Sequence, residues 1–335
     1  MRFLKICSYI CICVISLGVT VAAQVTDDEI LEVDTQLVDV PVVVTDKSGK
    51  PILNLKQNNF VVYEDGKPQD IANFSATEAP FEVALLLDTS GSTRSELRLI
   101  KRSAEMFIDS LRAGDRVSII AFNTDFDKDK RTNISTPFSV SETLIELTDD
   151  RSKLTEALAN VETSDGTPYY DGLVRVVEDA FKTKASNKFR GRRALVALTD
   201  GVDSTSDSDF GEARELLNES GIATYFIQIN TREMFESNLL GDCETGVRFS
   251  KTQIRRYYSL FGANSKIEKT YDFCKIGDFT KLDISKQLYA LANRQMQSLA
   301  KTSGGKVFHV ANVREARTAF GKVADEIGKK YSLGY

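Results

Sequence analysis

Apolar residues gather in five short runs along the chain, and polar segments with helical spacing separate these runs. The runs are Val83–Leu87, Val117–Phe122, Ala194–Leu198, Ala223–Ile229 and Lys306–Val310. They lack the alternation of apolar and polar residues that marks a half-exposed strand, which is typical of strands covered on both faces. The pattern therefore predicts five buried strands.

Helices are predicted between and after these strands. After the first run, apolar residues from Leu97 to Leu111 fall on one helical face, and Thr93 with Glu96 predicts a capping box at the start. Further helices are expected at Arg151–Val161, Asp171–Thr183, Asp207–Ser220, Ser285–Thr302 and Val313–Lys329. Alternating strands and helices predict an α/β fold with a doubly wound, Rossmann-like, mostly parallel sheet.

The residues before this fold have a different pattern, that of short strands joined by turns. Leu37–Thr45 and Phe60–Glu64 are predicted strands, and Asp65-Gly66 favours a tight hairpin that returns along Gln69–Phe74. We interpret residues 35–78 as a small β module, residues 80–330 as the α/β domain and residues 331–335 as a tail.

Polar side chains stand where two of the apolar strands end. Asp88-Thr89-Ser90-Gly91-Ser92 follows the first run, and Asp200-Gly201 follows the third. Side chains two residues apart point the same way in an extended chain, so Asp88, Ser90 and Ser92 present three oxygens to one point. Oxygen ligands favour a hard cation, Mg²⁺ or Mn²⁺. A loop at 164–168 offers a further hydroxyl, that of Thr167.

An Asp-x-Ser-x-Ser strand end, a loop Thr and a strand-end Asp-Gly, in this order, resemble the metal-ion-dependent adhesion site of von Willebrand factor type A domains. The β module resembles the entry to the VWFA-related domain proteins known chiefly from acidobacterial genomes, in Val-Pro-Val-Val-Val-Thr-Asp-Lys-Ser-Gly and Asn-Phe-Val-Val-Tyr-Glu-Asp-Gly-Lys-Pro-Gln. The closing Tyr331-Ser332-Leu333-Gly334-Tyr335 is similar too, although such proteins usually continue with further β structure.

The resemblance implies a metal site made by Asp88, Ser90, Ser92, Thr167 and Asp200. It implies Mg²⁺, or Mn²⁺, ahead of Ca²⁺, with a carboxylate of a partner completing the coordination. The expected partner is therefore a protein or cell-surface ligand that presents an acidic residue.

Other interpretations of these residues stay open. The metal could hold the loops together without a partner, or the two aspartates could only cap turns. A Mg²⁺-dependent hydrolase is the rival class, but the chain has no P-loop and no Gly-x-Ser-x-Gly, and its one histidine, His309, is expected to pack inside a strand. We therefore predict that the protein is not an enzyme. Asp125-x-Asp127-x-Asp129 has calcium-loop spacing but lacks the glycine and the distant Glu, which favours a solvated loop.

The first residues and the charge indicate where the protein works. Arg2 and Lys5 precede an apolar stretch that ends at Val21-Ala22-Ala23, which predicts a signal peptide at 1–23, a linker at 24–34 and no stable membrane span after cleavage. Export to the periplasm or the exterior follows. The net charge of −5 falls to −7 when Arg2 and Lys5 are removed, and such an acidic chain argues against nucleic-acid binding.

One segment breaks the alternation of strands and helices. Residues 231–283 show no sustained period and carry Cys243 and Cys274, a candidate disulfide in an oxidising compartment. Because this insertion leaves the carboxyl end of the strand Ala223–Ile229, we expect it at the same sheet edge as the metal site. It either shapes the choice of partner or is a decorative loop.

Overall fold

The computed structural model describes residues 38–42, 44, 46, 52, 54–77, 80–128, 135–183, 192–241, 248–262, 269–328 and 330–335. The predicted signal peptide and linker lie outside these residues. Among the described residues, no helix is long and apolar enough to cross a membrane.

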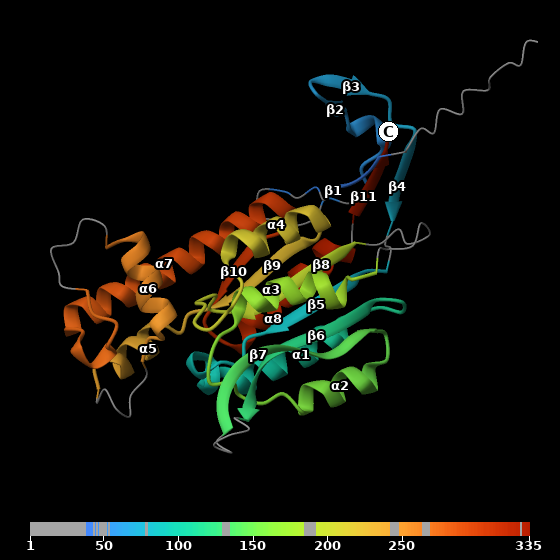
Figure 1. The fold of residues 1–335 in the computed structure, drawn as a ribbon. Helices are drawn as coiled ribbons and strands as arrows, with labels where there is room; N and C mark the ends of the chain where they lie inside the picture. Colours follow the sequence, from blue (N-terminus) through green and yellow to red (C-terminus); the bar gives the residue numbers. More distant parts are fainter. Residues whose placement is uncertain are drawn as a thin grey trace, which may run out of the picture. The chain divides into compact units, whose positions relative to one another are not determined.

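A six-stranded, mostly parallel sheet forms the centre of the fold, with strand order β10-β9-β8-β5-β6-β7 (Figure 1). The strands are β5 (Glu82–Leu87), β6 (Arg116–Lys128), β7 (Ser135–Thr148), β8 (Arg193–Thr199), β9 (Ala223–Ile229) and β10 (Val307–Val310). Only β7, an edge strand, runs antiparallel to its neighbour. The prediction of a doubly wound α/β fold is confirmed.

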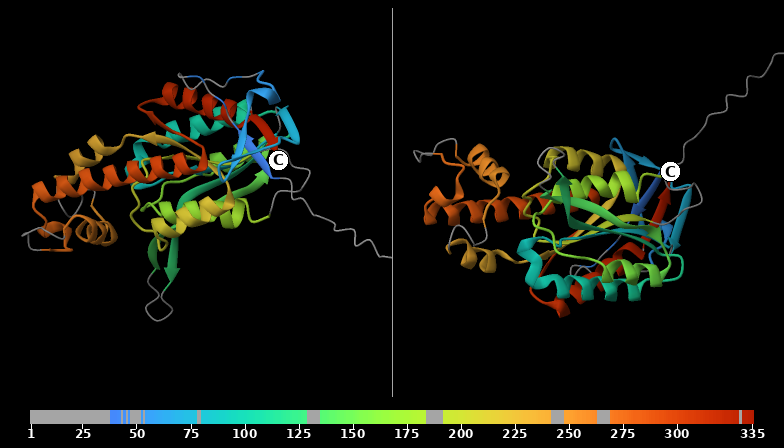
Figure 2. Two further views of the ribbon diagram at one scale, coloured as in Figure 1. Left: turned by 90° about the horizontal axis from the view of Figure 1, so that it is seen from above. Right: turned by 60° about the horizontal axis from the view of Figure 1, so that its bottom comes forward.

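Helices cover both faces of this sheet (Figure 2). On one face lie α1 (Leu97–Ser110), α2 (Arg151–Ala159) and α8 (Val313–Gly328), and on the other lie α3 (Tyr169–Arg175), α4 (Phe210–Ser220) and part of α7 (Asp278–Ser303). A π-helical turn, Val176–Ala180, continues α3. Strand β5 is buried throughout: Val83, Leu85 and Leu87 face the first cluster, and Ala84 and Leu86 face the second. Burial on both faces explains why this strand shows no alternation.

The small β module contains the end of the chain. Strand β11 (Lys330–Gly334) lies between β1 (Asp39–Val42) and β4 (Asn73–Thr77), antiparallel to both. The segment interpreted as a tail is thus the central strand of a sheet. The predicted hairpin is present as β2 (Val62–Glu64) and β3 (Lys67–Gln69), preceded by a 3₁₀ turn at Gln57–Asn59. Its predicted return along Gln69–Phe74 is wrong, because β3 ends at Gln69 and Asn73 begins β4, which pairs with β11.

The insertion is helical, contrary to its lack of a sustained sequence period. It forms α5 (Arg232–Leu239), α6 (Lys251–Leu260), a 3₁₀ turn η4 (Phe273–Lys275) and the first turns of α7. These pieces enclose an apolar cluster of their own. Short helices that share an aromatic core leave only a weak periodic signal. Cys243 lies outside the described residues, so its pairing with Cys274 stays a prediction.

Three local predictions are wrong. Residues Gly91–Glu96 form a 3₁₀ helix, η2, and α1 has Glu96 as its N-cap without a side-chain bond, so the capping box is absent. His309 is exposed, because β10 is an edge strand with one neighbour, β9. The expected solvated loop is a strand where the structure describes it: Asp125 and Asp127 are exposed on β6, and Asp129 lies outside the described residues.

Candidate metal centre

The carboxyl ends of β5 and β8 lie side by side. Leu87 pairs with Leu198, so the residues that follow, Asp88 and Asp200, leave the sheet at the same edge. A third segment joins them, because the backbone N–H of Ser164 donates to the carbonyl of Thr89 at 2.7 Å. Three sequence-distant pieces of the predicted site thus meet at one edge of the sheet.

Asp88 is completely buried and has neutral hydrogen-bond partners. Its Oδ1 accepts from the backbone N–H and the hydroxyl of Ser90, at 3.1 and 2.5 Å, and its Oδ2 accepts from the hydroxyl of Thr199 at 2.6 Å. The Thr93 hydroxyl donates to the carbonyl of Asp88 at 2.8 Å. Burial raises the pKa of Asp88, and the hydrogen bonds from Ser90 and Thr199 oppose that rise.

Asp200, also fully buried, is oriented from two sides. Its Oδ1 accepts from the backbone N–H of Val202 at 2.9 Å, within its own turn. Its Oδ2 accepts from the hydroxyl of Thr231 at 2.6 Å, and that hydroxyl lies 2.8 Å from the hydroxyl of Tyr289. Thr231 follows β9 and Tyr289 belongs to α7, so the start of the insertion and its long helix both hold this carboxylate.

Thr167 is fixed through its backbone. Its N–H donates to the hydroxyl of Ser204 at 2.8 Å, and its carbonyl accepts from the backbone N–H of Ser204 at 3.0 Å. This exchange ties the Thr167 loop to the loop that carries Asp200. Ser92 lies in η2, but its side chain is outside the described part of the chain. Whether the five predicted residues bind a metal together stays a prediction.

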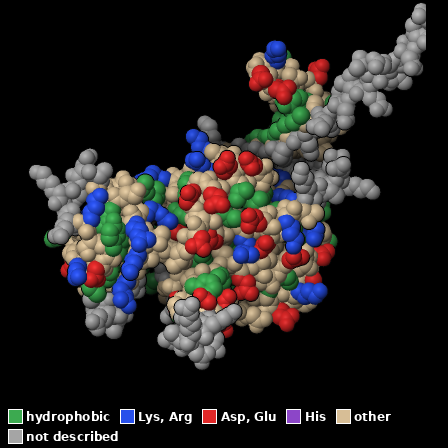
Figure 3. Space-filling model, in the orientation of Figure 1, with side chains coloured by type: hydrophobic (Ala, Val, Ile, Leu, Met, Phe, Trp, Pro, Cys, Tyr) green, Lys and Arg blue, Asp and Glu red, His purple; other side chains and the backbone are tan. Residues whose placement is uncertain are grey.

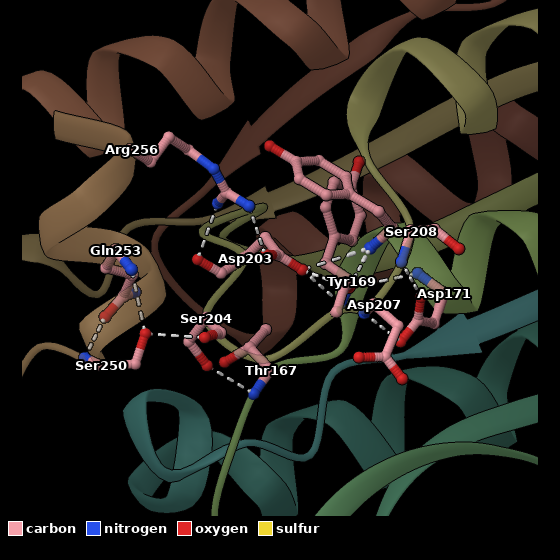
Figure 4. A network of polar contacts seen from close by, with 12 residues as sticks. Thr167, Tyr169, Asp171, Asp203, Ser204, Asp207, Ser208, Ser250, Gln253 and Arg256 are labelled. Atoms are coloured by element: carbon pink, nitrogen blue, oxygen red, sulfur yellow. Dashed lines mark hydrogen bonds and ion pairs between the residues drawn. The ribbon is translucent and has the colours of Figure 1, made fainter. Parts of the chain in front are cut away.

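A buried ion pair supports these loops and was not expected from the sequence. Arg256 of α6 donates to Asp203 Oδ1 at 2.8 Å and to the carbonyl of the same residue at 3.2 Å (Figure 4). The other carboxylate oxygen of Asp203 accepts from the backbone N–H of Tyr169 at 3.1 Å. One carboxylate therefore joins the Asp200 loop, the start of α3 and the insertion.

A cavity of about 810 Å³ opens beside these loops. Thr167 and Asp200 line it together with Gly91 and Ser95 of η2. The insertion lines it as well, as expected from the direction in which β9 leaves the sheet. The insertion residues are Met234, Phe235, Asn238, Arg248, Phe249 and Gln253, joined by Tyr289 of α7.

The donor chemistry suits a hard cation. Asp88 has hydroxyl and amide partners, and within the described residues no basic side chain makes an ion pair with it in the structure. A buried carboxylate without a counter-ion is costly, and a cation relieves that cost. Within the described residues no three His, Cys, Asp or Glu side chains form a metal cluster, so two carboxylates here would have to act together with hydroxyls.

Comparison with known proteins identifies the fold. The family model of the von Willebrand factor type A domain matches residues 82–257. No curated protein sequence matches the chain. Similar solved structures include a von Willebrand factor type A protein from Catenulispora acidiphila, at 13% identity and a TM-score of 0.44, covering 74% of this chain and 42% of that one.

Two further structures show the same degree of similarity. An aerotolerance-related membrane protein from Bacteroides fragilis has 17% identity and a TM-score of 0.42, with 74% of this chain and 98% of that one covered. A pilus adhesin from Lactobacillus rhamnosus GG has 12% identity and a TM-score of 0.44, with 75% and 30% covered. Matches at this level transfer no ligand or partner to this chain.

Proposed function

The chain belongs to the von Willebrand factor type A domain family, and on that premise we propose that it is an exported protein-binding module whose binding depends on a divalent cation. Asp88, Ser90, Ser92, Thr167 and Asp200 would hold the cation. A carboxylate of the partner would complete its coordination.

The buried carboxylate of Asp88 is the observation that carries this proposal. It is 0% exposed, it lies at the carboxyl end of a central strand, and its hydrogen-bond partners are neutral. In an open parallel sheet, ligands bind outside the carboxyl ends of the strands. A cation at this point would neutralise Asp88 and Asp200 together.

The proposed ligand set also explains why a partner would bind. Mg²⁺ prefers six oxygen ligands and keeps several waters when a protein supplies few charged ones. Hydroxyls from Ser90, Ser92 and Thr167 are neutral, so a bound ion retains positive charge and attracts an external carboxylate. The cavity that Thr167 and Asp200 line gives such a carboxylate a route to the site.

Calorimetric titration of Mg²⁺, Mn²⁺ and Ca²⁺ into the chelator-treated protein tests the proposal. We expect saturable 1:1 binding that is lost in Asp88→Ala and in Asp200→Ala. Asp165→Asn is the matched control, because Asp165 is an exposed acid that lines the same cavity but is outside the proposed ligand set. At a hundredfold excess over the dissociation constant, the cation should add about 2.7 kcal/mol to the free energy of unfolding.

The outcomes separate the proposal from its alternatives. Metal binding that stabilises the fold but leaves acidic peptides unbound would indicate a purely structural metal. Equal binding by the wild type and both alanine variants would place the ion elsewhere and end the proposal. Circular dichroism of each variant shows whether a lost signal reflects the site or the fold.

A further inference from the structure

The cavity has two chemically different sides, and this difference indicates what kind of partner segment fits it. The site side is mainly polar, with oxygen-bearing side chains from η2 and the loops of Thr167 and Asp200, and Val202 is its one apolar side chain. The insertion side contains Met234, Phe235 and Phe249. We propose that the site takes an extended acidic segment of a partner protein that carries a bulky apolar side chain within two residues of its carboxylate. This inference rests on the proposed function, because the carboxylate needs the cation.

The apolar side of the cavity is built from aromatic rings that pack against one another. Phe249 lies 5.4 Å from Phe235 and 6.0 Å from Phe273, measured between ring centres, and Phe235 lies 6.2 Å from the ring of Tyr289. Such a cluster of aromatic rings fixes the shape of the insertion side of the cavity, which we call the wall. Met234 stands beside it with 36% of its surface exposed, and a flexible thioether adapts to different apolar partners.

The wall is held against the metal-site loops by specific bonds. The hydroxyl of Ser250 donates to the carbonyl of Ser204 at 2.7 Å (Figure 4). Ser204 directly follows Asp203, the partner of Arg256. The hydroxyl of Ser95 in η2 donates to the sulfur of Met234 at 3.1 Å. Contacts on both sides of the cavity keep its width defined, so an extended segment meets both surfaces at once.

The dimensions suit a short peptide segment. A volume of about 810 Å³ lies within the usual range for ligand pockets, roughly 300–1,000 Å³. In an extended chain, side chains two residues apart point the same way and lie about 7 Å from each other. A carboxylate near Thr167 and Asp200 and an apolar side chain near Phe235 therefore fit in one cavity. Asn238 and Gln253 also line it; each uses one amide atom within the insertion, and the other atoms, Asn238 Oδ1 and Gln253 Nε2, suit a peptide backbone.

The charge of residues 248–260, within the insertion, favours an acidic partner. Residues 248–260 contain Arg248, Lys251 and Arg255, besides the Arg256 that is paired with Asp203, and no acidic residue, within a chain whose net charge is −5. Figure 3 shows Lys and Arg side chains gathered on the insertion, whereas Asp and Glu side chains predominate over the central part of the same face. A local excess of positive charge steers an acidic segment toward this end of the protein and away from the rest of its surface.

A peptide display experiment tests this inference. Random peptides with one fixed central Asp are selected on the full chain, with Mg²⁺ or with a chelator. We expect Mg²⁺-dependent enrichment of aromatic or large aliphatic residues within two positions of the Asp. A selected peptide should bind at least about tenfold more tightly than its copy with Ser at the apolar position, as burial of one such side chain predicts.

Two substitutions of exposed residues provide the matched comparison. Met234→Gln makes this side of the cavity polar but keeps an acceptor for the Ser95 hydroxyl, so it should remove most of the apolar preference while leaving Mg²⁺ affinity unchanged. Leu240→Gln removes a 45% exposed apolar side chain of the same insertion that does not line the cavity, and should change neither.

The outcomes distinguish a failure of this inference from a failure of the proposed function. Mg²⁺-dependent selection of Asp without an apolar preference, or a preference that Met234→Gln does not reduce, overturns the inference and leaves the proposed function standing. Equal enrichment with the chelator means that no cation takes part, which contradicts both. No enrichment from a protein that binds Mg²⁺ in the calorimeter overturns the inference alone.

Discussion

Asp203 is a buried carboxylate. Among the ion pairs of the described residues, its only cation is Arg256, which lies far from it in the sequence. Burial raises the pKa of Asp203, and the Arg256 guanidinium and the Ser206 hydroxyl oppose that rise. Because the pKa is higher in the folded state than in the unfolded chain, the folded state binds the proton more tightly. The stability that this group contributes is present below the unfolded pKa and is lost as pH rises through the folded pKa.

Removing the cation should make this dependence steeper. Arg256→Met leaves Asp203 buried without its partner, so its pKa rises further, and at neutral pH the free energy of unfolding should fall by about 3–5 kcal/mol. The loss should shrink as the solution becomes acidic, because protonated Asp203 needs no cation. Urea unfolding from neutral to mildly acidic pH measures this change.

Lys251→Met is the control for this experiment, since Lys251 is an exposed cation of the same helix. Its effect should stay below about 0.5 kcal/mol at every pH. Adding Asp203→Asn to Arg256→Met should recover part of the stability and remove the extra pH dependence. A loss in Arg256→Met that is constant with pH would show that Arg256 acts through packing on Tyr170, whose ring centre lies 4.9 Å from the guanidinium.

At the residue scale, sequence patterns locate the strand-end carboxylates but not their supports. Asp88 and Asp200 follow apolar runs, and this local feature is visible in the chain itself. Their partners lie far along the sequence: Thr199 is 111 residues from Asp88, and Thr231 is 31 residues from Asp200. Arg256 and Asp203 are separated by 53 residues. Threonines and an arginine in such places have no distinguishing local pattern.

At the scale of elements, the turn after β8 depends on how closely α7 passes it. Gly201 has a positive φ of 75°, and a Cβ added there would lie 2.8 Å from Met296 Cε of α7. The turn that carries Asp200 is thus packed directly on the long helix. A side chain at this position would strain the backbone and displace Met296 or the turn.

Gly201→Ala should therefore lower both stability and metal affinity. We expect a loss of about 1–3 kcal/mol in the free energy of unfolding and weaker Mg²⁺ binding in the calorimeter, because Asp200 moves with the turn. Gly304→Ala is matched to it: Gly304 ends α7 with the same φ of 75° but has open space around a Cβ. It should cost about 1 kcal/mol and leave Mg²⁺ binding unchanged. Unaltered metal affinity in Gly201→Ala would argue against Asp200 as a ligand.

Strands with a continuous apolar run were predicted, and a strand without one was missed. The five apolar runs became β5, β6, β8, β9 and β10, whereas the edge strand β7 is mostly exposed or half-buried and breaks its register with β6 near Ile119. Helix α7 begins at Asp278, seven residues before the predicted start at Ser285. Its first turns pack in the cluster of the insertion through Ile284, so their apolar pattern follows that local core.

At the scale of the whole molecule, strands from the two ends of the described chain form one sheet. Strand β11 lies between β1 and β4, which precede the six-stranded sheet in the sequence. The pairing was not predicted from the sequence, because five closing residues carry no local signal for partners that lie more than 250 residues earlier. The small module therefore receives its central strand from residues that follow the six-stranded sheet in the sequence.

Tyr331 makes this closure testable. Its ring, 3% exposed, lies 5.1 Å from that of Phe60 and 5.8 Å from that of Phe74. Its hydroxyl donates to the carbonyl of Ile52 at 2.9 Å and accepts from the backbone N–H of Leu55 at 2.8 Å. Tyr331→Ala removes the ring, and we expect about 3–5 kcal/mol less protection against hydrogen exchange for the amides of β1, β4 and β11.

The matched variant Tyr331→Phe keeps the ring and removes only the hydroxyl, which should cost about 1–2 kcal/mol. The amides of β5 and β8 should keep their protection in both variants, since their core is built from other residues. Equal loss of protection in β5 and β8 would mean that the module and the central sheet unfold together. In that case the closing strand would support the proposed metal site as well as the module, and Mg²⁺ affinity would fall in Tyr331→Ala along with the exchange protection.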